Sequence, residues 1–425
     1  MKKVAILLLM TLGLNAQQEF GTYFLNNLHQ SSELNPAFDV EQQFVVGLPS
    51  FYGVMHQRGI SITSALNGRL LDLVGPRRNQ VMLGTNVSLI KLSYKRDRIR
   101  YNFAHNYRHF TDFQFGNPLV ELVAGGNASV IGGSVMLQPN IGMTTYSETV
   151  LGLAYTGNFS FGANVKLLNG IHNLHTERSA IELSVNEDIY QLELNADFLL
   201  NSSFPINLQN LQLPSILSFN FVPNNFGLAF DLGISYQNGP IRISASALDL
   251  GFLNWAEQVH NYETQGTFVY DGADLEDVIG GNFNFIDTIG AILDFTDARA
   301  DYRYFVPAKF YGNVSYALTS KVNLGGLIYA HQNFDRLNGG AVINIQRHWN
   351  NRHAIAFQYG VVGSNPLNLG LSGYTTLGPV QLYAVSDHIL GTFKAFGAEN
   401  LNLRIGMNLV FQKREQSKSS QYAVN

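Results

Sequence analysis

The feature that most constrains this fold is an alternation of apolar and polar residues that recurs along the chain. In residues 400–411, every second side chain from Leu401 to Phe411 is apolar, and those between them are mostly small or polar. Successive side chains of a β-strand point to opposite faces, so this segment is predicted to have one apolar and one polar face. Taken alone, it fits either the closing strand of an outer-membrane barrel or the edge strand of a soluble sheet.

The same alternation returns elsewhere, which is stronger evidence than a single instance. In 226–237, bulky apolar residues alternate with small or polar ones, and 159–167 and 190–200 repeat the pattern. Between Ala247 and Leu248 the apolar positions shift by one residue, which predicts a β-bulge.

Along the chain, short links between these segments mostly alternate with long ones. Asn238-Gly239, a strong two-residue hairpin signal, is a short link, whereas 202–225 and 254–303 are long. Outer-membrane barrels have short periplasmic turns and longer outer loops, and a soluble sandwich has no reason to keep that order. We therefore predict an all-β fold, a transmembrane antiparallel β-barrel.

The strand count follows from the closing segment. Counting back from Phe411 gives about sixteen strands, within a range of roughly fourteen to eighteen, and places the first near residue 56. The stretch 44–52 would add one strand, which an even-stranded barrel does not allow. We expect this stretch either to lie in the lumen or to merge with the next strand. Short helices are expected in the long links, near 69–74, 117–122 and 283–295.

Composition favours a barrel over a helical membrane protein. Charged residues make up only 14% of the chain, well below the roughly 25% of an average soluble domain. No apolar run long enough for a helical span occurs after residue 20. Because only alternate residues of a barrel strand meet lipid, a chain of this kind suits transmembrane strands. The net charge of −4 gives no reason to expect nucleic acid as a partner.

The N-terminus has the pattern of a secretory signal peptide. Basic Met-Lys-Lys is followed by an apolar run to Leu14 and by Ala16, so we expect cleavage after Ala16. The chain contains no cysteine, which excludes disulfides, a lipid-anchored cysteine and thiolate metal sites. We expect a mature protein in the outer membrane of a Gram-negative bacterium.

These observations predict four regions. They are a signal peptide at 1–16, an N-terminal segment and candidate plug at 17–55, an outer-membrane β-barrel at 56–412 and a polar periplasmic tail at 413–425. Phe411 is the expected insertion signal, read by the barrel-assembly machinery, and outer-membrane lipid is the expected surrounding.

Charged residues on the polar faces of the predicted strands are candidates for the lumen. They are Glu182, Glu193, Asp197, Asp231, Arg242 and Arg404. Such charges either form an internal salt-bridge lattice that rigidifies the barrel or line a polar conduit for a ligand, and we favour the lattice.

Catalytic and metal-binding patterns are weak. His172, His175 and Glu177 have loose spacing for a metal site, and the acidic stretch 271–277 does not match an EF-hand loop. No hydrolase elbow, zinc-protease motif or phosphate-binding loop occurs, so we expect no enzyme activity, no metal and no cofactor. A Ser–His hydrolase site assembled in space is kept as a remote alternative.

Several short motifs together resemble an uncharacterised Bacteroidota family of outer-membrane β-barrels, a domain of unknown function. They are Asn35-Pro36-Ala37-Phe38, Val46-Gly47-Leu48-Pro49, Phe230 to Tyr236, Ser244 to Phe252, Pro307 to Tyr311, Gln381 to Asp387 and Asn400 to Gly406. The Asn-Pro-Ala-Phe motif, a candidate plug motif, is also similar to one in long-chain fatty-acid transporter barrels and in barrels of the type IX secretion machinery.

The resemblance implies two functions. By analogy with the fatty-acid transporters, the barrel would bind or pass a hydrophobic small molecule past a plug. By analogy with the secretion barrels, it would be a non-enzymatic scaffold for secretion-system components or surface-protein anchoring. Fold analogy alone supports both, so neither is derived from the residues themselves.

Overall fold

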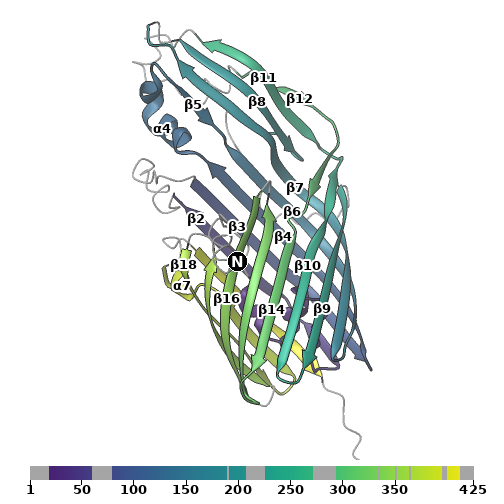
Figure 1. Cartoon of the computed structure of the whole chain (residues 1–425). Helices are drawn as coiled ribbons and strands as arrows, with labels where there is room; N and C mark the ends of the chain where they lie inside the picture. Colours follow the sequence, from purple (N-terminus) through teal and green to yellow (C-terminus); the bar gives the residue numbers. More distant parts are fainter. Residues whose placement is uncertain are drawn as a thin grey trace, which may run out of the picture.

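The protein is an all-β, antiparallel closed barrel with a few short helices (Figure 1). The computed structural model describes residues 19–59, 79–188, 191–206, 225–270, 293–333, 336–349, 352–362, 365–394 and 400–411. Several predicted regions lie outside these residues, namely the signal peptide, the helix at 69–74, the acidic stretch 271–277, most of 283–295 and the tail 413–425. Among the described helices, none is long and apolar enough to cross a bilayer.

The wall has 14 strands when β1 and β2 are counted as one. These strands are β1 (Phe44–Gly47), β2 (Ser50–Arg58), β3 (Asn79–Arg96), β4 (Ile99–Phe115), β6 (Asn140–Tyr155), β7 (Phe159–Val185), β9 (Asn225–Asn238), β10 (Ile241–Trp255), β14 (Lys309–Ala317), β15 (Val322–Asn333), β16 (Arg336–Trp349), β17 (His353–Val362), β18 (Asn365–Leu377), β19 (Val380–Ser386) and β20 (Asn400–Phe411).

The barrel closes between its first and last strands. β1 and β2 both pair with β20 on one side and with β3 on the other, and Phe44 lies opposite Phe411. The stretch 44–52 therefore merges with the following residues into the first wall strand. The wall begins at Phe44, earlier than the position near residue 56 expected from the sequence, and residues 400–411 are the closing strand as predicted.

The wall has fourteen strands, the lower limit of the predicted range and two fewer than the count of about sixteen, because 159–185 forms one long strand and 190–200 does not line the wall. β8 (Leu192–Ser202) pairs with the upper part of β7, and β11 (His260–Tyr270) pairs with β8. Together with β5 (Ser134–Leu137) and β12 (Thr296–Ala298), these strands form an extension sheet that rises above one side of the barrel (Figure 1). We call this end of the barrel the upper end.

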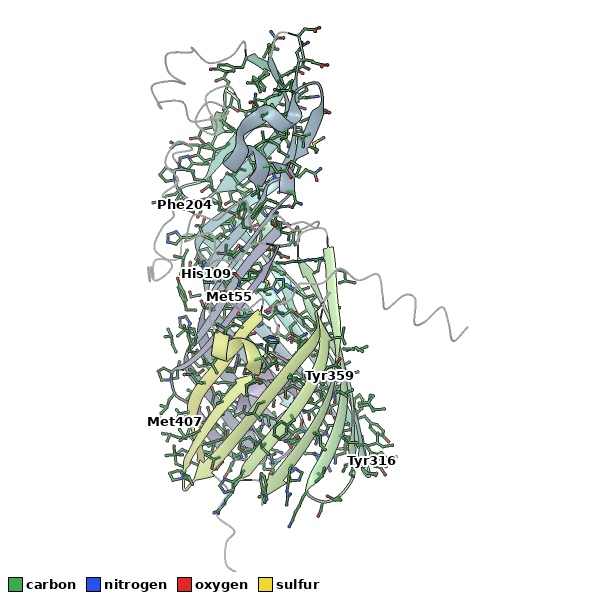
Figure 2. All side chains as sticks on the ribbon, turned by 90° about the vertical axis from the view of Figure 1, so that its left-hand side faces the viewer. Met55, His109, Phe204, Tyr316, Tyr359 and Met407 are labelled. Atoms are coloured by element: carbon green, nitrogen blue, oxygen red, sulfur yellow. The ribbon has the colours of Figure 1, made fainter. Side chains whose placement is uncertain are left out.

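The wall buries the polar face of its strands, whereas the extension sheet buries the apolar face. In β9, apolar side chains such as Leu232 and Ile234 face outward and are exposed, whereas Asp231 and Ser235 face inward and are buried. Tyr316 and Met407 project outward on opposite sides of the lower barrel (Figure 2). An apolar exterior around a polar interior is the arrangement of a barrel surrounded by lipid.

The extension sheet has the arrangement of a water-soluble sheet. In β8 the apolar residues Leu192 and Leu194 are buried, and the polar residues Glu193 and Asn195 between them are exposed. The buried side packs near α4 (Asn117–Gly125), which begins with proline in its first turn and confirms the helix predicted near 117–122. The 3-10 helix η3 (Gly126–Val130) follows it.

The predicted β-bulge is present in β10. Its register against β9 shifts between Ala247 and Leu250, and Asp249 at this point has a φ of 60°. A bulge turns an extra side chain toward one face of the sheet. Here Leu248 and Asp249 are both buried, so the bulge adds a carboxylate to the barrel interior. The short strand β13 (Tyr302–Phe305) pairs with β10 above the bulge.

Candidate functional site

Residues 19–43, which we call the N-terminal segment, are largely buried and make contacts with both halves of the wall. The segment contains the short helix α2 (Phe20–Phe24) and the 3-10 helix η1 (His29–Glu33). Its sequence has no strand period, and helical turns and wall side chains meet several of its backbone hydrogen bonds. Three groups of contacts with the wall, which we call seats, hold the segment in place.

The first seat is Asp387, the residue after β19. Its carboxylate accepts hydrogen bonds from the backbone N–H groups of Phe20 (3.0 Å) and Gly21 (2.7 Å). The side-chain amides of Gln358 (2.7 Å) and Asn402 (3.0 Å) also donate to Asp387. The first turn of α2 is therefore fixed to the wall formed by β17, β19 and β20.

The second seat is a glycine socket on the opposite wall. Gly162 of β7 and Gly233 of β9 are direct register partners and face inward. A Cβ on Gly162 would overlap Pro36, and a Cβ on Gly233 would overlap Asn35. Asn35 Nδ2 donates to the carbonyl groups of Ile234 (3.3 Å) and Ala245 (3.2 Å). The predicted plug motif thus rests in a recess that only glycine leaves open.

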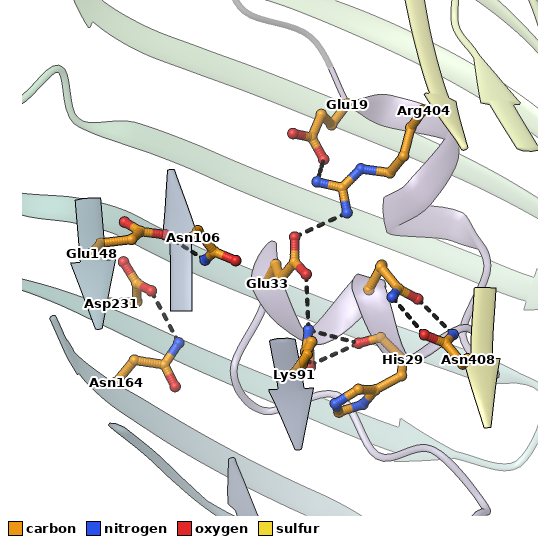
Figure 3. Close-up of polar contacts among 12 residues, drawn as sticks. Glu19, His29, Glu33, Lys91, Asn106, Glu148, Asn164, Asp231, Arg404 and Asn408 are labelled. Atoms are coloured by element: carbon orange, nitrogen blue, oxygen red, sulfur yellow. Dashed lines mark hydrogen bonds and ion pairs between the residues drawn. The ribbon is translucent and has the colours of Figure 1, made fainter. Parts of the chain in front are cut away.

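The third seat is a line of charges (Figure 3). Arg404 of β20 lies 2.9 Å from Glu19 and 2.9 Å from Glu33, and Lys91 of β3 lies 3.0 Å from Glu33. Lys91 Nζ also donates to the backbone carbonyl of His29 at 3.2 Å. All of these charges are buried or nearly so, so each depends on its partners for compensation.

Removing the arginine of this line should weaken the folded state strongly. We expect Arg404→Leu to lower the free energy of unfolding by about 3–5 kcal/mol, because Glu19 and Glu33 would stay buried without a counter-charge. Unfolding by guanidinium in detergent micelles measures this loss. Arg352→Leu, at an exposed turn, should leave the midpoint unchanged. The variant that also carries Glu19→Gln and Glu33→Gln should regain much of the loss, and an unchanged midpoint for Arg404→Leu alone would refute this role.

The two sides of the N-terminal segment face different parts of the barrel wall. Phe20, Tyr23 and Phe24 pack in one apolar cluster with residues of β14 to β16, including Tyr311 and Tyr329. Polar and charged groups of β4, β6, β7, β9 and β10, together with Lys309 of β14, line the other side. Their ion pairs include Lys166–Asp231 (2.8 Å), Lys166–Asp249 (2.5 Å), Lys309–Asp249 (3.1 Å) and Arg108–Glu148 (2.8 Å).

Above the segment lies a cleft of about 600 Å³, which we call the upper cleft. Its lining is half apolar and half polar, and includes Tyr304, Phe305 and Val306 together with His175, Arg303 and Gln332. It lies between the upper part of β7 and the rim at β13. The two elements touch through Tyr302 Oη, which donates to Asn173 Oδ1 at 2.9 Å, and through the rings of His175 and Tyr304.

Below the upper cleft, three further cavities between described residues measure only 10–30 Å³. Arg108 lines all three, and each has room for one or two water molecules. Within the described residues, the N-terminal segment and the charged wall therefore fill most of the interior.

The structure separates the predicted lumen residues into two groups. Asp231 and Arg404 are buried in the ion pairs described above. Arg242, near the lower turn, faces Gln237 and donates to it at 2.7 Å. Their role toward a ligand stays a prediction.

Glu182, Glu193 and Asp197 do not lie in the lumen. They belong to the extension sheet, where Asp197 pairs with Arg178 at 2.8 Å and Glu193 is exposed. Alternation predicts two faces for a strand but does not tell which face meets water, and this is why their placement failed.

Several interior residues escaped the sequence analysis. Glu33 lies in a segment without periodicity, and Asp249 faces inward because of the bulge. Lys91, Arg108 and Lys309 lie on inward positions of strands for which no alternation stood out. Of the weaker candidates, His175 and Glu177 approach to 3.5 Å, and the described residues contain no group of three or more such side chains placed to hold a metal ion. His105 and His109 pair with Thr149 and Thr145 of β6.

Comparison with known proteins gives one family and several distant folds. The model of the family described as "Family of unknown function (DUF5723)" matches residues 36–387. No curated protein matches the chain. A FadL homologue of Pseudomonas aeruginosa is 10% identical with a TM-score of 0.45, covering 94% of this chain and 99% of that one. The toluene transporter TodX of Pseudomonas putida is 10% identical with a TM-score of 0.41, covering 94% and 98%.

Proposed function

This chain belongs to the family of unknown function DUF5723, and we propose that it is an outer-membrane barrel that binds a small, largely apolar molecule in the upper cleft. The observation that carries this proposal is the cleft itself. Its volume of about 600 Å³ lies within the range of roughly 300–1,000 Å³ typical of small-molecule sites. Aromatic and aliphatic side chains make up half of its lining, and a few polar groups are available to orient a ligand.

The membrane location rests on the outward face of the wall. Exposed apolar side chains cover strands all around the barrel, and water would disfavour such a surface on a monomer. A bilayer satisfies it, because a closed barrel pairs all of its backbone groups internally. With the short turns on the periplasmic side, the extension sheet and the upper cleft face the exterior of the cell.

The N-terminal segment is the plug in this proposal. A ligand held in the upper cleft meets the segment and the charged wall before it can go further. Passage therefore requires the segment to leave at least one of its three seats. Binding in the cleft and passage through the barrel are separate properties, and each has its own test.

Ligand binding is expected to require the free volume of the upper cleft. The chain has two tryptophans, and Trp255 is buried in one cluster with Tyr304 and Val306 of the cleft. In a Trp349→Phe background in lipid nanodiscs, Trp255 fluorescence should respond to at least one of the probes octane, 1-octanol and octanoate. Adding Ala308→Phe, which fills the cleft, should abolish the response.

The matched control is Ala317→Phe, at the lower end of the same strand, β14. It should leave the response unchanged. If none of the three probes alters Trp255 fluorescence, or if both phenylalanine variants behave alike, the upper cleft is not a binding site.

A scaffold role in secretion or surface-protein anchoring is the second candidate. Two observations favour it, the filled interior and the exposed polar face of the extension sheet. A photo-crosslinking residue at Glu193 should then capture one discrete partner in cells, whereas the same residue at lipid-facing Tyr316 should not. Equal capture at both positions, or none at Glu193, would count against it. The bacterial group, the barrel-assembly machinery and the secretion components all stay predictions.

A further inference from the structure

The upper cleft borders a polar recess. This recess has a volume of about 30 Å³ and shares Tyr304, Val306 and Pro307 with the cleft. Lys309 and His331 lie on its inner side and are register partners across β14 and β15. The head group of a molecule in the cleft would therefore lie next to the recess.

His331 is the unexplained group of the recess. Its side chain is only 1% exposed, and within the described part of the chain neither ring nitrogen has a hydrogen-bond partner. Its visible contacts are with the rings of Phe110 and Tyr329. A buried polar group without a partner is costly, so its partner is expected to be a molecule that enters the recess.

The chemistry of the recess selects the kind of group that fits. A buried imidazole is favoured in its neutral form, which offers one N–H donor and one acceptor nitrogen. Lys309 pairs with Asp249 at 3.1 Å, and its ammonium carries three N–H donors, so donors remain for a guest oxygen. A hydroxyl group can accept from Lys309 and donate to the imidazole at the same time.

Other head groups satisfy the recess less well. A carboxylate only accepts hydrogen bonds, so it would leave the acceptor nitrogen of His331 unmatched. The two cations of the recess, Lys309 and Arg108, are already paired with Asp249 and Glu148. An alkane would leave both nitrogens unmatched. A cavity needs roughly 10–15 Å³ of free volume to hold one water, so the recess of about 30 Å³ has room for one or two waters. A terminal hydroxyl therefore fits in place of a single water.

We propose that the upper cleft selects molecules with an apolar body and a terminal hydroxyl group, and that His331 with Lys309 is the site that recognises the hydroxyl. This inference rests on the proposed binding function and adds the substrate class to it. Water occupies the recess in the absence of such a molecule, and the alcohol displaces it.

The test compares three probes of equal chain length. In the Trp349→Phe background, titration of Trp255 fluorescence should show 1-octanol binding about tenfold more tightly than octane or octanoate, the effect of one well-formed hydrogen bond. His331→Phe should remove this preference, so that 1-octanol binds no more tightly than octane. His331→Gln, which keeps a donor and an acceptor, should retain part of it.

The control is His353→Phe, which replaces a histidine near the lower end of β17 and should keep the preference for the alcohol. A change in gel migration on heating reports whether each variant is folded. The affinities of the three probes can also be ranked with the recess unchanged, so that part of the test does not depend on the folding of a recess variant. Equal affinity for all three probes would overturn hydroxyl recognition while leaving the cleft as a binding site. Tighter binding of octanoate would overturn it in favour of an anionic head group. Absence of any binding would instead overturn the proposed function.

Discussion

A leucine at Gly233 is expected to expel the plug motif from its socket and to open the barrel to ions. The Cβ alone overlaps Asn35, whose neighbour Pro36 is packed against Gly162 on the adjacent strand. Overpacking of this kind typically costs about 1–3 kcal/mol, which the segment can avoid by leaving the seat. In planar bilayers, we expect the closed wild-type barrel to become a stable ion-conducting pore.

The control for this variant is Gly326→Leu. Gly326 also lies in a wall strand, and no atom lies within 4 Å of an added Cβ. It should stay closed, so any conductance of Gly233→Leu would come from the socket. Protease cleavage within residues 19–43 of the folded variant gives a second readout. If Gly233→Leu remains closed and resistant, the glycine socket does not hold the plug.

Deleting residues 400–411 should abolish membrane assembly altogether. β20 pairs with β19 on one side and with β1 and β2 on the other, so its loss leaves two open edges in the bilayer. Unpaired backbone groups cost several kcal/mol each in lipid. The deletion also removes Arg404 and Asn408, which hold Glu33 and Gln30 of the N-terminal segment.

Truncation at residue 412 is the matching control for the closing strand. It removes only the tail 413–425, so assembly should proceed at the wild-type level. Outer-membrane fractionation and heat-modifiable gel migration measure the assembly of both shortened proteins. Normal assembly without residues 400–411 would contradict the closing role of β20.

The sequence predicts the wall well because its signal is local. In 226–237 and 400–411, residues two positions apart lie on the same face of the strand, so the sequence assigns each residue to a face. The exposed Leu232 and the buried Arg404 confirm the assignment. The bulge near Ala247 is also visible locally, as a shift of period. Features that depend on one strand and its register are therefore within reach of sequence analysis.

The sequence predictions fail where contacts between residues far apart in the chain determine the structure. Residues 190–200 alternate as clearly as a wall strand, but pairing with the upper part of β7 places them in the extension sheet with the apolar face buried. The interior network escaped for the same reason. No pattern near Glu33 indicates that Arg404 will pair with it, and His331 lies on a strand whose sequence gives no sign of the recess it faces.

The seats of the N-terminal segment also set an order of assembly. Phe20 and Gly21 bind Asp387, and Gln30 bonds Asn408, so contacts of the earliest described residues require the last two wall strands. Contacts separated by more than 360 residues form late, because the intervening chain must first be ordered. The part of the described chain that is synthesised first thus completes its contacts only when the part synthesised last is in place.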